Sequence, residues 1–237
     1  MSSRWFLPYI LVLSTMLFTC EKSDYRRMAE TFAAMKEKKE ATVVLIGDSL
    51  SGGEYTPSGT SWGYFLKSLL AGFLGVHISF INSSRPDETF IRAIRHMQED
   101  IFSFRPDVVI VMLGMNDSTM PELTADGFRF IAEKFFSMLR NEGVFVVVLT
   151  STGYRDASPG DEPYASIREF NSTLSFQARL QHFPVIDVAR MMDELRSKEP
   201  ETYRSLFVDS VHLNEKGQQI LAGFVCDSIR TMVEREK

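Results

Sequence analysis

Five short, mostly apolar runs constrain the fold of this 237-residue chain more than any other feature. Each run holds five to seven residues, and most are rich in β-branched side chains. The runs cover residues 42–46, 77–81, 107–113, 144–149 and 184–188. A strand with apolar residues on both faces must be covered on both faces, as in a parallel sheet packed between helices. The runs therefore predict five buried parallel strands.

Between these runs the apolar positions recur with the period of a helix. Phe128, Ile131 and Phe135 share one face of a segment that ends at Gly143, and the last segment of the chain has the same pattern. Asn214 is placed to cap that last helix. Strands that alternate with helices through right-handed crossovers predict an α/β fold, a three-layer α/β/α sandwich with a five-stranded parallel sheet. The sequence shows no second domain and no internal repeat.

The composition excludes two classes of function. The chain has 26 Lys and Arg residues against 31 Asp and Glu, a formal net charge of −5, so no nucleic acid partner is expected. Its two cysteines and four histidines are too few for a disulfide framework, a Cys-based zinc site or a His-rich metal cluster. We therefore expect neither a metal nor another cofactor, and a chain of this length can fold around one apolar core.

The first nineteen residues differ from the rest of the chain. Arg4 is the one charge before an apolar run at 5–18, which stops at Cys20 and the polar residues after it. This order is typical of a signal peptide, here residues 1–19. The run is shorter than the roughly 20 residues that span a bilayer, and Pro8 interrupts it. We therefore expect export, with the protein in the cell envelope or secreted.

Cys20 determines whether an exported chain would be attached to a membrane. The tetrapeptide Leu17-Phe18-Thr19-Cys20 resembles a bacterial lipobox, in which the cysteine is lipidated, but Phe18 and Thr19 replace the usual small residues. Four outcomes stay open: a lipoprotein anchored to the membrane through Cys20, a conventionally cleaved periplasmic or secreted protein, an uncleaved N-terminal anchor, and a cytosolic protein with an apolar N-terminal tail. In each case residues 20–40 follow as a linker or helical segment, and residues 41–237 form the folded domain.

A serine follows the first predicted strand, in the stretch Gly47-Asp48-Ser49-Leu50. Ligands of open α/β sheets bind outside the carboxyl ends of the strands. A serine at this place can expose its hydroxyl beside backbone N–H groups of the following turn, which makes Ser49 a candidate nucleophile. The alternative is a polar turn or a helix cap. The stretch matches neither a P-loop nor the glycine pattern of the α/β-hydrolase elbow.

An asparagine follows the third predicted strand, in the stretch Gly114-Met115-Asn116-Asp117. The amide of Asn116 can donate an N–H to an oxygen that becomes negative during acyl transfer. Ordinary turn chemistry is the alternative, because Asn and Asp are common after strands. Asn116 is therefore a candidate oxyanion donor.

A carboxylate precedes a histidine by three residues in Asp209-Ser210-Val211-His212, before the final helix. If both lie in one turn, Asp209 can accept the Nδ1–H of His212 and leave Nε2 free to take a proton. The alternative is a solvated aspartate beside a capping histidine. The other histidines, at positions 77, 96 and 182, have no comparable aspartate and are interpreted as structural.

The three motifs together indicate more than each does alone, because the predicted fold brings them to one edge of the sheet. A nucleophile, a base with its orienting carboxylate and an oxyanion donor form a complete set for acyl transfer. The set resembles the SGNH (GDSL) hydrolase superfamily of esterases and lipases, over nearly the whole chain after the N-terminal segment. The resemblance implies a flavodoxin-like sheet, no metal, Ser49 as nucleophile, His212 as general base and Asp209 as its orienter. It also implies that Asn116 and the Ser49 backbone N–H form part of the oxyanion hole.

One loop departs from the family pattern. Members usually carry Asn-x-Gly after the second strand, and here Asn82-Ser83-Ser84 places Ser84 at the glycine position. Ser84 keeps a backbone N–H for the oxyanion hole, but its Cβ disfavours a positive φ and its side chain is expected to enter the pocket mouth. Either Ser84 still donates and narrows the substrate range, or the oxyanion hole is weakened.

The expected activity is hydrolysis of O-acyl esters by a serine enzyme. A two-metal phosphoesterase would need a denser set of ligands than this chain has. Two alternatives stay open: a low-turnover or inactive envelope protein that binds a glycan or acyl ligand, and an O-acyltransferase. Segments 54–60, 85–86 and 151–163 are expected to line the entrance, but polar loops suit a sugar ester, a lysophospholipid or a thioester equally well.

Overall fold

The computed structural model describes residues 26–56, 58–157 and 160–235. Its centre is one sheet of five parallel strands in the order β2-β1-β3-β4-β5. The strands are β1 (Glu40–Gly47), β2 (His77–Asn82), β3 (Val108–Met112), β4 (Phe145–Leu149) and β5 (Val185–Ile186). This order is that of flavodoxin-like folds, so the predicted α/β class and five-stranded parallel sheet are confirmed.

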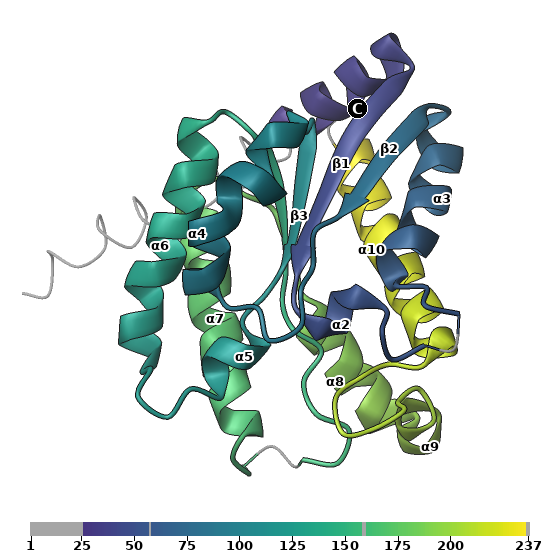
Figure 1. Ribbon diagram of the computed structural model, residues 1–237. Coiled ribbons are helices and arrows are strands. Elements are labelled where there is room, and N and C mark those ends of the chain that lie inside the picture. Colours follow the sequence, from purple (N-terminus) through teal and green to yellow (C-terminus); the bar gives the residue numbers. More distant parts are fainter. Residues whose placement is uncertain (1–25, 57, 158–159, 236–237) are drawn as a thin grey trace, which may run out of the picture.

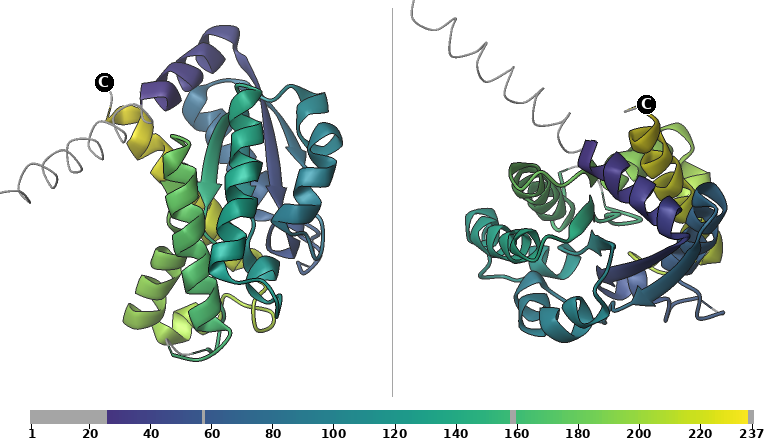
Figure 2. Two further views of the ribbon diagram at one scale, coloured as in Figure 1. Left: turned by 90° about the vertical axis from the view of Figure 1, so that its left-hand side faces the viewer. Right: turned by 90° about the horizontal axis from the view of Figure 1, so that it is seen from above.

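Helices cover both faces of the sheet, as the continuous apolar strands require (Figure 1). Every residue of β3 and β4 is buried. One face packs against residues 26–38, which are helical, and against α3 (Trp62–Leu74), α8 (Val188–Lys198) and α10 (Glu215–Glu234). The other face packs against α4 (Phe90–Asp100), α6 (Ala125–Asn141) and α7 (Tyr164–Leu180). Seen from above, the two helical layers lie on either side of the sheet (Figure 2).

Local signals explain where several helices begin and end. Thr124 caps α6 by accepting a hydrogen bond from the N–H of Gly127, and Asn214 caps α10 in the same way, as predicted. The chain leaves α6 through Gly143, whose φ of 72° favours glycine. The strand β5 is shorter than its apolar run, because Asp187 caps α8 and turns the chain away from the sheet.

The core extends upstream of residue 41. Met28, Phe32 and Met35 lie on the helix at 26–38 and are almost completely buried in the cluster that includes β1 and α10. The helical part of segment 20–40 thus packs as a structural layer of the domain. The predicted signal peptide and Cys20 lie outside the described residues. None of the helices in the described part of the chain is both long and apolar enough to span a bilayer.

The remaining elements are short and irregular connections. They comprise α2 (Ser49–Gly52), η1 (Phe102–Phe104), α5 (Met115–Ser118) and α9 (Pro200–Arg204). Two of these, α2 and α5, directly follow β1 and β3 at their carboxyl ends, which lie at the bottom of Figure 1. They bring the first two sequence motifs to the same edge of the sheet.

Candidate active site

The edge of the sheet where the motifs meet is formed by two neighbouring strands. Gly47 at the end of β1 lies opposite Met112 at the end of β3. Ser49 is the first residue of α2, and Asn116 lies in α5. The two residues thus follow adjacent parallel strands, as the topology of an open α/β sheet requires.

A continuous chain of hydrogen bonds joins Ser49 to residues near the other end of the sequence. The Nε2 of His212 lies 3.0 Å from Oγ of Ser49, although the residues are 163 positions apart. The Nδ1 of His212 lies 2.7 Å from Oδ2 of Asp209. A carboxylate can only accept, so Nδ1 carries the proton and the lone pair of Nε2 faces the serine hydroxyl. The structure therefore brings together the three residues that the sequence motifs singled out.

Asp209 is held by more than the histidine ring. Its Oδ1 accepts hydrogen bonds from the backbone N–H groups of Val211 at 2.9 Å and His212 at 2.8 Å. Partial burial raises the pKa of Asp209, but the hydrogen bonds from His212 and Val211 outweigh it and hold the pKa below its usual value. Asp209 is therefore ionised at neutral pH and fixes the orientation of the imidazole.

Asn116 lies at this edge with its amide oriented by the loop after β2. Its Nδ2 donates a hydrogen bond of 3.0 Å to the backbone oxygen of Glu88. An amide nitrogen carries two hydrogens, so a second donor remains on Asn116. The Asn116 side chain is thus held in place by one N–H, and its second N–H is available to an acceptor.

Ser84 differs from the sequence expectation. Its N–H donates to Oδ1 of Asn82 at 3.1 Å, so this donor is already engaged. Its hydroxyl is buried without a hydrogen-bond partner and lies against Gly47, so the expectation that the side chain enters the pocket mouth was wrong. Its φ is not positive. The left-handed residue of this loop is Asp87, with a φ of 55°, and the short motif after the strand did not reveal it.

Three fully buried carboxyl groups lie behind the site. Asp48, Glu88 and Asp117 have no solvent exposure. Asp48 accepts one hydrogen bond from the N–H of Leu50, and its Oδ2 has no partner. Burial raises the pKa of Asp48 to about 7, with a smaller part of the rise due to the charges of Asp117 and Glu88, and the hydrogen bond from Leu50 offsets only part of it.

The pKa of Asp117 is raised for the same reason. Burial raises its pKa to about 7, even though both of its oxygens accept from the N–H of Phe90. Within the described residues, no group of three or more His, Cys, Asp or Glu side chains is arranged to hold a metal ion. The sequence showed two of these aspartates inside the motifs, but only the fold shows that they are inaccessible to water.

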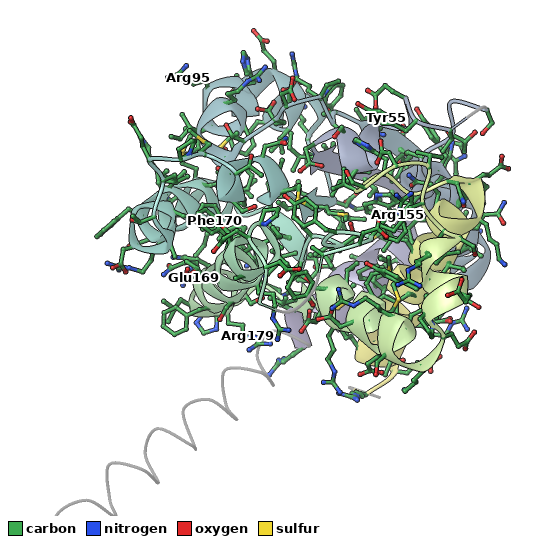
Figure 3. The ribbon with its side chains drawn as sticks, turned by 90° about the horizontal axis from the view of Figure 1, so that it is seen from below. Tyr55, Arg95, Arg155, Glu169, Phe170 and Arg179 are labelled. Atoms are coloured by element: carbon green, nitrogen blue, oxygen red, sulfur yellow. The ribbon has the colours of Figure 1, made fainter. Side chains whose placement is uncertain are left out.

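Sequence reasoning also missed an aromatic contact. Tyr55 lies in the loop between α2 and α3, and its ring stacks on His212 with 3.4 Å between the ring centroids and an angle of 13° between the planes. Figure 3 views the molecule from the end that holds the carboxyl ends of the strands, and Tyr55 is labelled there. The loop was expected near the entrance, but a tyrosine in a polar turn carries no signal for a ring partner 157 residues away.

A groove of about 710 Å³ lies between α7 and α8, away from this hydrogen-bonded chain. Polar residues such as Asn171 and Asp193 contribute to its lining. Neither Ser49 nor His212 lines it. The candidate site is therefore distinct from this groove.

A family comparison agrees with the geometry at this edge. The model of the GDSL-like lipase/acylhydrolase family matches residues 45–220, about three quarters of the chain. The chain belongs to this family. It is accordingly a carboxylic ester hydrolase, as the motifs predicted. A sequence comparison with curated proteins found no match.

Solved structures share the fold at low sequence identity. The lipase/acylhydrolase from Enterococcus faecalis is 23% identical with a TM-score of 0.66, and the match covers 81% of this chain and 96% of that one. The acetyl xylan esterase AlAXEase is 19% identical with a TM-score of 0.69, covering 79% and 98%. The acetylxylan esterase Axe2 from Geobacillus stearothermophilus is 18% identical with a TM-score of 0.70, covering 80% and 94%. At these identities the likeness establishes the fold alone.

Proposed function

We propose that this family member is a serine esterase in which Ser49 is the nucleophile, His212 the general base and Asp209 the residue that orients the base. The observation that carries the proposal is the unbroken chain of hydrogen bonds from Ser49 Oγ through both ring nitrogens of His212 to Asp209. An ordinary serine hydroxyl is a weak nucleophile, and a neutral imidazole within hydrogen-bond distance is what activates it.

The reaction proceeds in two steps. As Ser49 Oγ attacks the ester carbonyl, its proton passes to Nε2 of His212, and His212 then gives that proton to the leaving alcohol. The acyl group stays on Ser49 until water, deprotonated by His212, attacks it and regenerates the hydroxyl. Asp209 keeps its charge throughout and stabilises the imidazolium.

The negative oxygen of each tetrahedral intermediate needs donors that are already in place. We assign this role to the free N–H of the Asn116 amide and to the backbone N–H of Ser49. The N–H of Ser84, which the family resemblance also suggested, is engaged by Asn82 in the resting structure. It contributes only if that hydrogen bond opens when substrate binds.

The substrates that we propose are esters of short acyl groups on an alcohol such as a sugar. Two of the similar structures named above are described as acetyl xylan esterases. The sequence shows no extended apolar lid of the kind that would cover a long acyl chain. A panel should therefore include acetylated xylo-oligosaccharides, p-nitrophenyl esters of increasing acyl length, a lysophospholipid and a thioester.

The decisive experiment compares the wild type with Ser49→Ala on this panel. We expect the hydrolysis rate to fall at least about 10,000-fold, because the covalent step is lost. Thermal unfolding should change little. Ser68, exposed on α3, provides the control: Ser68→Ala should retain full activity. Hydrolysis that persists in Ser49→Ala would remove this residue from its proposed role, and acid release without an added acceptor separates hydrolysis from acyl transfer.

A further inference from the structure

The imidazole of His212 is contacted on three sides, and the proposed mechanism uses only two of them. Asp209 binds Nδ1 and Ser49 binds Nε2, while the ring of Tyr55 covers one face at 3.4 Å in nearly parallel orientation. The His212 side chain is only 12% exposed, whereas Tyr55 is 43% exposed. Tyr55 therefore stands between the imidazole and solvent.

The loop that presents Tyr55 is closed on itself. The hydroxyl oxygen of Thr56, a buried residue, lies 2.9 and 3.0 Å from the backbone oxygens of Gly53 and Thr60, which share its one proton. The N–H of Gly59 donates to the backbone oxygen of Thr56 at 3.0 Å. Gly53 has a φ of 90°, and a Cβ there would lie 2.8 Å from the Gly59 oxygen. The phenol ring is thus carried by a compact turn.

A stacked ring restrains the tilt of the imidazole plane, which the two hydrogen bonds do not restrain. Bonds at Nδ1 and Nε2 lie near the ring plane on opposite sides, so the imidazole can still rock about the line that joins them. A flat partner against one face restricts this rocking. The face of an aromatic ring is also electron-rich and attracts a cation, so it favours the imidazolium over the neutral imidazole.

We propose that Tyr55 is a positioning residue for His212, whose ring holds the imidazole plane and stabilises the imidazolium that forms when Ser49 attacks. The proposal rests on the function proposed above and deepens it. Tyr55 acts through His212 and is assigned no contact with the substrate.

The charged groups around His212 leave this effect separable. Asp209 is the charged group in hydrogen-bond contact with the ring. Arg155 lies in the loop after β4. Its backbone N–H donates to the backbone oxygen of Ser210 at 2.8 Å, and its guanidinium forms an ion pair with Asp156. A substitution at Tyr55 leaves all of these groups in place.

Two variants distinguish the effect of an aromatic face on His212 from the effect of simply covering the imidazole. Tyr55→Leu keeps an apolar cover over His212 but removes the aromatic face, while Tyr55→Phe keeps the face and removes only the hydroxyl. In the leucine variant we expect the plateau of kcat/KM for p-nitrophenyl acetate to fall about tenfold, with little change in KM. We expect the phenylalanine variant to stay within about twofold of the wild type on both parameters.

The pH profile provides the specific readout. The active form carries neutral His212, so activity rises with pH on the acidic limb. Without the aromatic face the imidazolium is less stable and loses its proton at lower pH. In Tyr55→Leu the midpoint of the acidic limb should therefore move down by about 0.5 pH units, and in Tyr55→Phe it should not move. A loop that had merely lost its shape would lower the plateau without moving the midpoint.

An NMR titration of the His212 imidazole makes the test independent of turnover. The same downward shift in Tyr55→Leu, with none in Tyr55→Phe, supports the proposal even if Ser49→Ala retains activity, an outcome that would defeat only the proposed function. An unchanged midpoint in Tyr55→Leu overturns the inference. So does a shift in both variants, which would implicate the hydroxyl, or a rise in KM alone, which would make Tyr55 a substrate contact.

Discussion

Asp209 and Asp48 lie at the same end of the sheet, one linked to Ser49 through His212 and the other preceding Ser49 in the chain, yet their chemistry is opposite. The Asp209 side chain is 44% exposed and accepts three hydrogen bonds. Asp48 has no exposure, accepts one side-chain hydrogen bond from Leu50 and leaves Oδ2 without a partner. The pKa of Asp209 is lowered, and that of Asp48 is raised to about 7.

The difference shows that nearness to Ser49 does not decide whether a carboxyl group is ionised. The number of donors aimed at it and its access to water decide whether it is ionised. Asp209 has enough of both to serve as a fixed negative charge. Asp48 has a single side-chain donor and no access to water, so near neutral pH its carboxyl group is protonated in a large fraction of the molecules, and it caps α2 next to Ser49.

Among the variants that test this comparison, the largest effect on activity is expected from exchanging each of these two carboxyl groups for its amide. In Asp209→Asn, the amide can donate where Asp209 accepts, which favours the wrong tautomer of His212 and should lower kcat about a thousandfold. In Asp48→Asn the cap to Leu50 can persist through Oδ1, and kcat should fall less than about tenfold. Steady-state kinetics on a p-nitrophenyl ester measure both. Equal losses would mean that the two aspartates do not differ as the structure indicates.

The second comparison concerns how the free energy of unfolding depends on pH. The folded-state pKa of Asp48 and Asp117 lies above the ordinary value of 3.8, so folding retains protons that the unfolded chain releases. Their contribution to stability is therefore lost as pH rises from about 4 to about 7, by up to about 4 kcal/mol for each group.

In the neutral variant Asp117→Asn, the melting temperature should depend less on pH than in the wild type. Its melting temperature should fall less than that of the wild type between pH 4.5 and pH 8 at constant ionic strength. Asp209→Asn provides the opposite case. Since the folded-state pKa of Asp209 is lowered, its contribution is present above the ordinary pKa and is lost as pH falls. If the melting temperatures of wild type and Asp117→Asn changed equally with pH, the assignment of a buried, protonated carboxyl group would be contradicted.

The smallest effect is expected at Ser84, whose hydroxyl, like Oδ2 of Asp48, is buried without a partner. Because φ is not positive there and the N–H is bound to Asn82, a glycine relieves no strain and frees no donor. Ser84→Gly should change kcat/KM by less than about threefold and lower the stability by about 0.5–1 kcal/mol through backbone entropy. A rise in activity of tenfold or more would show that Ser84 limits the oxyanion hole.

Much of the fold was predictable from local patterns. The apolar runs located all five strands, and the helical period with Asn214 located the start of α10, because burial on both faces and capping leave local signatures. The run at 184–188 was too long because the capping of α8 by Asp187 competes with strand pairing. The side chain of Ser84 was wrongly expected at the pocket mouth, because a three-residue motif does not report how its loop packs against the end of β1.

By itself, the sequence determined the order of strands and helices, the family motifs and the residue types available for acyl transfer, since these depend on neighbouring residues and on spacing. Only the tertiary structure decided that Ser49 and His212 share a hydrogen bond, that Tyr55 covers the imidazole and that Asp48 is cut off from water. Such distances and exposures arise from packing between segments far apart in the chain, and packing leaves no local trace in the order of residues.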